Sequence, residues 1–513
     1  MIAATDAQVS NTAPAKQVGV IYPLQYLRAI AAFAVVLCHA SYYVKDVRGD
    51  GRMWEIFDRA GGLGVGLFFA ISGYLMAQLA QNNPPLKFLT HRIIRIYPIY
   101  WLSVLVVVVA GMPFGKFAWP DMTALLLVPG LTQSYVLGVE WTLPFELTFY
   151  VIVFLLILLG LGRKLPIVAV FWVFLIEVFL VVKPGLQQGQ FPGLLHLPLS
   201  AFSLPFAMGM VVPWAVNRGL VGPATPLVAA AFLFFSESMA GISAGLFYGF
   251  SAIGCTLLVA WAVRHRQTEG EPIAALLALG DWSYALYLIH APIIIALCKY
   301  LPLSVGTMQL WFAAVGLPLI AAVIFGKIDI GLYRIVKRKV DLAPRKFRVA
   351  LCVIFLALLA SISAFHYAQV FQNKIDAENV EPVALRVEAL LSESKQGDGL
   401  LAAARRAGLS ESIHLKGNFD GVYDQGKSVR VHGWAASLLP EDKVKVLIFH
   451  CGKYLGVAPN SENRPDVAQV LRIAERRSGF TSDLAKRGEC SEHNVEGLIL
   501  GQRSEFILIS GSF

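Results

Sequence analysis

The stretch Gln25–His39 reads QYLRAIAAFAVVLCH and places Arg28 near one end and His39 at the other end of an apolar run. Eleven positions separate Arg28 from His39. This is about three turns of an α-helix, so both side chains lie on one helical face, roughly 16 Å apart along the axis. A charged group inside a membrane helix is costly and is by default a candidate for function. A structural interpretation also fits, in which Arg28 extends toward the aqueous interface and His39 caps the helix.

The rest of the chain has the composition of a membrane protein. Of its 513 residues, 56% are hydrophobic and 15% are charged, and the mean hydropathy is +0.62. Several apolar runs approach the roughly 20 residues that cross a bilayer. The net charge of +9 comes from short basic clusters between these runs, which is typical of topology signals and does not favour a nucleic-acid partner. Residues 1–18 are polar and predict a disordered cytoplasmic tail.

We predict eleven membrane helices from the apolar runs. They are 21–43, 62–80, 96–112, 143–161, 165–182, 198–217, 224–240, 242–263, 282–301, 308–331 and 347–370. With the N-terminus in the cytoplasm, sixteen lysines and arginines fall in inner segments and seven in outer loops. This bias predicts a multi-pass inner-membrane protein with an extracytoplasmic C-terminus. The expected architecture is an all-α membrane domain of ten helices over residues 19–335, with an eleventh helix at 345–371.

A small mainly-β soluble domain is expected after the last membrane helix. Residues 372–412 read as a linker with short helices, and residues 413–513 contain alternating, β-branched and glycine-punctuated runs. Outside the cytoplasm, a disulfide between Cys451 and Cys490 is permitted. The chain contains no CxxC or HExxH pattern, so no metal site is predicted.

Three further polar groups interrupt the apolar pattern. In KFLTHRIIRIYPIYW, Arg92 and Arg95 are three positions apart, so their guanidinium groups can converge on one anionic ligand. Basic residues at the cytoplasmic end of a helix also satisfy the topology rule. In VEWTLPFELTFY, Glu146 follows Pro144 in the first turn of a predicted helix. We expect it at the depth of His39, where a carboxylate would orient an imidazole, although the helix dipole alone also favours it there.

Two more stretches allow a structural and a functional interpretation. In GDWSYALYLIHAPI, Tyr287 and His290 face one side of a helix, where they line a cavity or bond to a neighbouring helix. GGLGVGLFFAISGYLM lacks the GxGxxG spacing of a nucleotide loop. Its Gly62 and Gly66 form a GxxxG pattern, which predicts close helix packing.

Taken in order, five stretches resemble the acyltransferase-3 family of integral-membrane O-acyltransferases over about residues 20–335. They are YLRAIAAFAVVLCH, GVGLFFAISGYLM, HRIIRIYPIYW, EWTLPFELTFY and WSYALYLIHAP. The resemblance implies a membrane domain that transfers an acyl group, usually acetyl from cytoplasmic acetyl-CoA, to a hydroxyl of a surface or secreted glycan. The implied partners are acyl-CoA, a glycan or lipid-linked saccharide, and membrane lipid, with no metal.

The resemblance also implies roles for individual residues. The catalytic residues would be His39, acting as base or as transient acyl carrier, with Glu146 and Arg28. The donor-binding residues would be Arg92, Arg95, Ser72, Tyr287 and His290. The depth difference between the arginines and His39 is what transfer across a membrane requires.

The C-terminal stretch VRVHGWAAS…RPDVAQV…SGF, residues 429–480, resembles a small β module found beside glycan-processing enzymes. It suggests glycan contact through Trp434, Arg464 and Asp466, although Trp434 also suits a core position. The alternative function is a polytopic transporter or flippase with an extracytoplasmic binding domain, in which Arg28, His39 and Glu146 line the substrate path. Transporters often carry inverted repeats, and no such symmetry is visible in the sequence.

Overall fold

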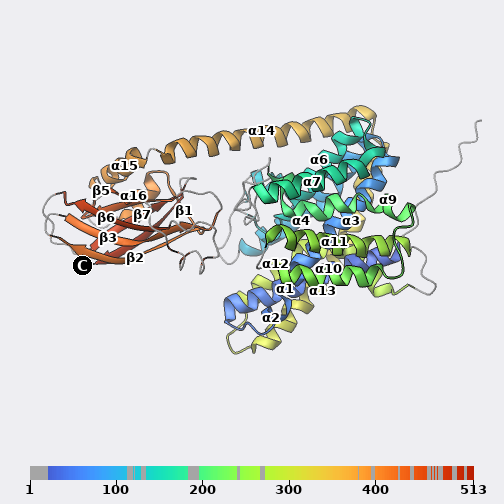
Figure 1. Cartoon of the computed structure of the whole chain (residues 1–513), viewed down its shortest axis with the longest axis horizontal. Coiled ribbons are helices and arrows are strands. Elements are labelled where there is room, and N and C mark those ends of the chain that lie inside the picture. The colour runs from blue at the N-terminus through green and yellow to red at the C-terminus, as the bar shows by residue number, and fades with distance from the viewer. Residues whose placement is uncertain are drawn as a thin grey trace, which may run out of the picture.

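The protein folds into a helical region followed by a region of strands, as a computed structural model shows (Figure 1). The structure describes residues 21–112, 120, 122–128, 135–182, 196–239, 243–265, 272–378, 380–393, 399–425, 428–439, 444–458, 464, 467, 471, 478–487, 494–501 and 505–512. The predicted tail at 1–18 lies outside these residues. The combination of an α-helical membrane region and a C-terminal β region is therefore confirmed.

The helical region contains the apolar helices that the sequence predicts. Its elements are α1 (Tyr22–Arg48), α2 (Trp54–Phe57), α3 (Ala60–Asn82), α4 (Pro85–Gly111), α5 (Met122–Leu125), α6 (Thr142–Leu158), α7 (Leu165–Val182), α8 (Leu204–Gly209), α9 (Val212–Asn217), α10 (Thr225–Met239), α11 (Ala244–Arg264), α12 (Ala274–Tyr300), α13 (Thr307–Leu342) and α14 (Arg345–Glu378), with 3₁₀ turns at 162–164, 197–199 and 201–203. Among the described residues, eight helical segments are long and apolar enough to cross a membrane. Three shorter apolar helices match the remaining predicted spans.

Several helix boundaries differ from the prediction. Helix α4 begins at Pro85 instead of 96, and α12 begins at Ala274 instead of 282. Helix α13 continues to Leu342, beyond the predicted end at 331. The prediction ended each helix at its charged residues. In the fold some of these charges have partners on neighbouring helices, and the helical backbone continues through them: Arg95 pairs with Asp329, His91 with Asp341, and Asp281 with Gln25.

Small residues let the central helices approach closely. Buried alanines on α1 face its neighbours, and a Cβ at Gly64 of α3 would lie 2.6 Å from the Ala31 carbonyl oxygen. Gly73 of α3 and Gly209 of α8 leave no room for side chains at the crossing of their helices. The predicted GxxxG contact is wrong in detail, because a Cβ at Gly62 would meet nothing within 4 Å. Packing of this kind is how membrane helices associate.

Residues 122–128, between α4 and α6, pack against the helical region. Aromatic side chains of α4 donate hydrogen bonds to the carbonyl oxygens of this segment: Tyr97 to Leu126, Tyr100 to Ala124 and Trp101 to Leu125, at 2.8, 2.8 and 2.9 Å. Irregular backbone at membrane depth is tolerated only where protein groups satisfy its polar atoms. These bonds therefore allow Ala124, Leu127 and Val128 to be buried.

A buried carboxylate satisfies the backbone N–H groups of the turn that leads into α6. Glu140 is fully buried, and it accepts hydrogen bonds from the backbone N–H groups of Leu137 and Val139 at 2.6 and 3.0 Å. The Tyr287 hydroxyl donates to the Val139 carbonyl at 2.5 Å. Helix α6 thus begins inside the protein, after a turn whose backbone groups are bonded to Glu140 and Tyr287.

The C-terminal region is a two-sheet arrangement with a helical cover. Its strands are β1 (Ser410–Glu411), β2 (Leu415–Asp424), β3 (Ser428–Ser437), β4 (Lys445–His450), β5 (Lys453–Ala458), β6 (Gly479–Ala485), β7 (Asn494–Leu500) and β8 (Glu505–Ser512). One sheet has the order β1-β8-β7-β4-β5 and the other β2-β3-β6. Inward-facing residues of both sheets, among them Phe419, Ile448 and Phe480, form one apolar core.

The segment predicted to be a linker is partly a component of this region. Helices α15 (Val380–Ser392) and α16 (Leu400–Arg406) bury apolar residues against the five-stranded sheet. Helix α14 leads from the helical region to the strands (Figure 1). Cys451 is disulfide-bonded, and Cys490, its predicted partner, lies outside the described residues.

Candidate active site

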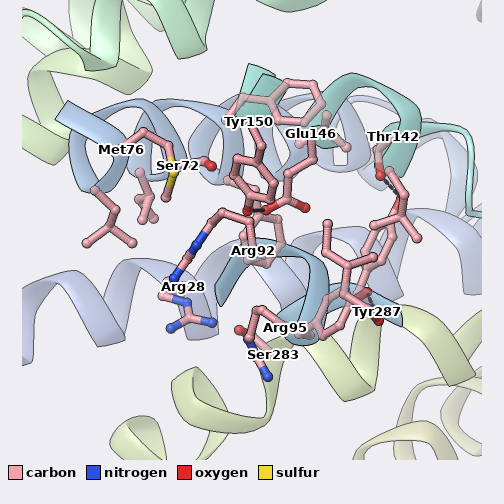
Figure 2. Close-up of a pocket in the computed structure, with 18 of the residues that line it drawn as sticks. Arg28, Ser72, Met76, Arg92, Arg95, Thr142, Glu146, Tyr150, Ser283 and Tyr287 are labelled. Atoms are coloured by element: carbon pink, nitrogen blue, oxygen red, sulfur yellow. Dashed lines mark hydrogen bonds between the residues drawn. The ribbon is translucent and has the colours of Figure 1, made fainter. Parts of the chain in front are cut away.

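A cavity of about 290 Å³ lies among α1, α3, α4, α6, α12 and α13. Six of the eight predicted site residues line it: Arg28, Ser72, Arg92, Arg95, Glu146 and Tyr287. Figure 2 shows Arg28 and Arg92 on one side of this space, with Glu146 beside Tyr150. The fold therefore brings together side chains that are far apart in the sequence, and we call this space the arginine cavity.

Arg95 is the arginine whose charge is already neutralised. Its Nη1 atom lies 2.7 and 2.9 Å from the two carboxylate oxygens of Asp329, which is 2% exposed. The guanidinium also lies over the rings of Tyr284 and Tyr333, at 5.0 and 5.5 Å. Arg95 therefore joins α4 to α13 and has little remaining capacity for an anionic ligand.

Arg92 and Arg28 are different, because neither is within ion-pair distance of a carboxylate in the described part of the chain. The Arg92 guanidinium lies over the Tyr150 ring at 5.7 Å, and its buried Nε has no hydrogen-bond acceptor there. Arg28 donates to the Gln25 side-chain oxygen at 3.3 Å. A buried, unsatisfied guanidinium donor is costly unless a ligand accepts from it. These two side chains fit an anionic group such as a phosphate.

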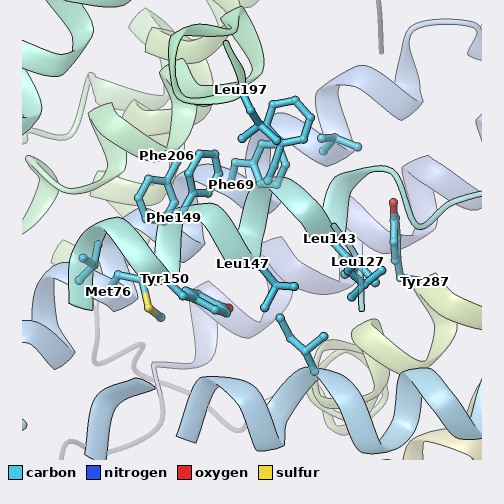
Figure 3. Close-up of a cluster of buried hydrophobic side chains, with 14 of the residues drawn as sticks. Phe69, Met76, Leu127, Leu143, Leu147, Phe149, Tyr150, Leu197, Phe206 and Tyr287 are labelled. Atoms are coloured by element: carbon cyan, nitrogen blue, oxygen red, sulfur yellow. The ribbon is translucent and has the colours of Figure 1, made fainter. Parts of the chain in front are cut away.

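Glu146 lies in the arginine cavity rather than beside His39. The Tyr150 hydroxyl donates to its carboxylate, and Ser72 hydrogen-bonds Tyr150 in turn. The expectation that Glu146 orients His39 is wrong, because the Glu146 carboxylate lines the same cavity as Arg28 and accepts from Tyr150, whereas the His39 ring bonds His290. Packing fixes this position: Leu127, Leu143 and Tyr287 belong to the apolar cluster around α6 (Figure 3).

The partner of His39 is another imidazole. Nδ1 of His39 in α1 lies 2.9 Å from Nε2 of His290 in α12, with the ring centroids 5.0 Å apart. Tyr43 stacks on the other side of His39, at 6.3 Å between centroids. His290 does not belong to the cavity lining, so its predicted role in donor binding is not supported by its position. We call His39 and His290 the histidine pair.

Tyr287 lies at both the arginine cavity and the histidine pair. It lines the arginine cavity, and its ring centroid lies 5.8 Å from that of His290. Its hydroxyl is 2.7 Å from Thr142 Oγ1 and donates to the Val139 carbonyl. Tyr287 therefore fixes the start of α6 against α12, between the cavity and the histidine pair.

Asp329 is a site residue that the sequence analysis missed. It is a carboxylate within the apolar stretch GKIDIGL of α13, at 326–332. The rule that an ionisable residue in a membrane helix is a functional candidate would have singled it out. Its partner was not evident, because 234 positions separate it from Arg95 in the chain.

Two of the three residues suggested for glycan contact, Trp434 and Arg464, lie in the smaller sheet and beside it. Trp434 of β3 is half-buried and pairs in register with Asn418 and Gly479. Arg464 donates to the Asp420 carboxylate at 2.6 Å. Asp466 lies outside the described residues, so glycan contact here stays a prediction.

A family model described as an acyltransferase domain matches residues 21–327, which is more than half of the chain. The chain belongs to the acyltransferase-3 family. The matched residues carry the histidine pair and, except for Asp329 and Tyr333, the residues described in the arginine cavity. The protein is therefore a multi-pass membrane acyltransferase.

Individual relatives agree with this assignment. The exopolysaccharide production protein ExoZ of Rhizobium meliloti is 29% identical over 50% of this chain and 84% of its own. The acyltransferase MdmB of Streptomyces mycarofaciens is 24% identical over 52% of this chain and 77% of its own. The BcsY protein of Komagataeibacter xylinus, named as a membrane-bound transacylase, is 25% identical over 74% of this chain and 87% of its own. No solved structure matches the chain.

Proposed function

We propose that the protein transfers an acetyl group from cytoplasmic acetyl-CoA to a hydroxyl of an extracytoplasmic glycan. The observation that carries this proposal is the arrangement on α1. Arg28 faces an arginine cavity with unneutralised guanidinium groups, and His39, roughly 16 Å away along the same helix, belongs to an uncharged imidazole pair. CoA carries its phosphates at one end and its thioester at the end of a long flexible arm. A donor of this shape places its phosphates and its reacting carbon at two separated sites.

Arg92 and Arg28 would bind the phosphates of the donor. Both present guanidinium donors without a carboxylate partner in the described residues, and Arg92 has a buried Nε that lacks an acceptor. Arg95 lines the same cavity but is already paired with Asp329. The Glu146 carboxylate, bonded to Tyr150, offsets part of the positive charge of the cavity. Charge-assisted hydrogen bonds of guanidinium to phosphate are among the stronger polar interactions in proteins.

His39 would act as the base. Its ring takes the proton of the acceptor hydroxyl while the hydroxyl oxygen forms a bond to the thioester carbonyl carbon. The carbon–sulfur bond then breaks, and the proton passes from His39 to the sulfur, which leaves as the CoA thiol. The ester remains on the acceptor. His290 supports His39 by the hydrogen bond between their rings.

The membrane orientation follows the charge bias, with the N-terminus of α1 in the cytoplasm. Helix α14 contains 34 residues, about 51 Å of helix, which is longer than the roughly 30 Å hydrocarbon core. The strands would then lie outside the cytoplasm, on the side of His39, where the Cys451 disulfide is stable. The name of ExoZ, an exopolysaccharide production protein, supports a polysaccharide as the acceptor.

The test is transfer of labelled acetyl from acetyl-CoA to extracted surface glycan in membranes that contain the protein. We expect label in the glycan with the wild type, and none with His39→Ala at equal expression. His265→Ala is the matched control, because His265 ends α11 and lies outside the arginine cavity and the histidine pair. Absence of transfer with acetyl-CoA and with other acyl-CoA donors would refute the proposal and favour a transport function.

A further inference from the structure

The hydrogen bonds of His290 determine where its ring proton lies. Its Nδ1 atom lies 2.8 Å from the Tyr287 carbonyl oxygen and 3.2 Å from that of Leu286. A carbonyl oxygen only accepts, so Nδ1 of His290 must carry the hydrogen. A neutral imidazole carries one ring hydrogen, and Nε2 of His290 therefore has a lone pair.

The same reasoning extends to His39. The His290 lone pair faces Nδ1 of His39 at 2.9 Å, and this contact is a hydrogen bond only if Nδ1 of His39 carries a hydrogen. His39 thus has its lone pair on Nε2.

A charged His290 would be the alternative, with hydrogens on both nitrogens. His290 is 0% exposed, and among the residues that the structure describes no carboxylate lies within ion-pair distance of it. A buried charge without a partner is far more costly than a neutral, hydrogen-bonded imidazole. The neutral arrangement of the pair is therefore the stable one.

We infer that His290 is a positioning residue that holds His39 in the Nδ1–H form, so that Nε2 is the atom that takes the acceptor proton. Free histidine in water favours the opposite form, with hydrogen on Nε2, so the pair reverses the usual preference. This inference rests on the proposed function and deepens it. It assigns His290 to the positioning of the base, His39, instead of to the binding of the acyl donor.

The tautomer can be measured without turnover. We would record the ¹⁵N spectrum of the full chain, labelled at histidine, in lipid nanodiscs, and identify His39 from the signals lost in His39→Gln. We expect a protonated Nδ1 and an unprotonated Nε2 at His39 in the wild type, and a shift toward the Nε2–H form in His290→Leu. A wild-type His39 protonated at Nε2, or an unchanged tautomer in His290→Leu, would overturn the inference. Neither result depends on whether acetyl-CoA is the donor.

Activity gives the second test. The side-chain oxygen of glutamine can take the place of Nε2 of His290 and accept from His39, whereas leucine cannot. We expect His290→Leu to lower kcat about 100-fold with unchanged donor KM, and His290→Gln to recover at least a tenth of wild-type kcat. Equal losses in the two variants, at equal expression and equal donor KM, would contradict a positioning role. His265→Leu is the control for loss of a histidine elsewhere.

Discussion

The arginine cavity and the histidine pair each include one residue of helix α1, Arg28 and His39, but the cavity is lined by charged groups and the pair is neutral. The cavity gathers charge, with Arg28, Arg92 and Glu146 in its lining and Arg95 paired to Asp329. The histidine pair is neutral; its two rings bond to each other, and His290 also bonds to a backbone carbonyl. Guanidinium groups keep their charge in a protein interior and suit a permanent anion. A neutral imidazole suits a proton transfer. Under the proposed function, the arginine cavity therefore binds the donor and the histidine pair carries out the chemistry.

The strongest test of this separation is His39→Ala. We expect a fall in kcat of about 1,000-fold, because general-base catalysis contributes about 10²- to 10⁴-fold, while the dissociation constant for acetyl-CoA stays unchanged. Transfer of labelled acetyl and equilibrium binding of the donor measure the two quantities. If the variant also weakens donor binding tenfold, the two places do not have separate tasks.

The complementary variant is Arg92→Ala. We expect the KM for acetyl-CoA to rise about 10- to 100-fold with a smaller change in kcat, because hydrogen bonds to a charged group contribute about 1.5 to 3 kcal/mol each. Arg92→Lys should recover part of the affinity as a point charge without the planar geometry. Arg218→Ala is the control, since Arg218 follows α9 and lies outside the cavity lining. An unchanged KM would remove Arg92 from the donor site.

Within the cavity, Asp329→Asn separates structural from ligand-binding arginines. The variant leaves Arg95 charged without its carboxylate, and we expect a loss of about 3 kcal/mol in the free energy of unfolding. Thermal unfolding in detergent or nanodiscs, followed by size-exclusion of the soluble fraction, measures the loss. The double variant Arg95→Met with Asp329→Leu should regain most of it, because a buried ion pair replaced by apolar residues is often neutral. A double variant as unstable as the single one would show that the ion pair itself is needed.

The smallest effect is expected in the β region, at an exposed ion pair between β3 and β6. Arg430 donates to both Asp483 carboxylate oxygens at 2.7 Å, and this hydrogen bonding lowers the pKa of Asp483 below its ordinary value. A lowered pKa in the folded state stabilises the fold above the unfolded-state pKa of about 4, and the contribution is lost as the pH falls through the folded-state pKa.

Hydrogen exchange of the full chain tests this pair. Asp483→Asn should slightly increase exchange in the β3 and β6 peptides at neutral pH, and the difference from wild type should disappear in strong acid, where the carboxylate is protonated. Because the pair is exposed, the effect should be small and weaker in high salt. If the difference in exchange between Asp483→Asn and the wild type grows on acidification, the expected loss of the stabilising contribution in acid is contradicted.

Much of the molecule could be read from local patterns. Long apolar runs predict membrane helices because the bilayer requires about 20 apolar residues with every backbone group bonded within the segment. Alternating runs after residue 413 predict strands for an equally local reason, the two-residue period of a half-buried sheet. The identities of Arg28 and His39 as candidates followed from the cost of placing them in such runs, and that of Arg92 from its spacing of three positions from Arg95.

The partners of these residues were decided by the tertiary structure alone. The spacing of Arg28 and His39 is fixed within one helix. Whether Glu146 lies near His39 or lines a cavity with Arg28 depends on how α6 packs against the other helices around that cavity. The pairs Arg95–Asp329 and His39–His290 join residues 234 and 251 positions apart, and no local period encodes them. The sequence determines which side chains are too costly to leave unpaired in a membrane, and only the packing of whole helices determines which group satisfies each one.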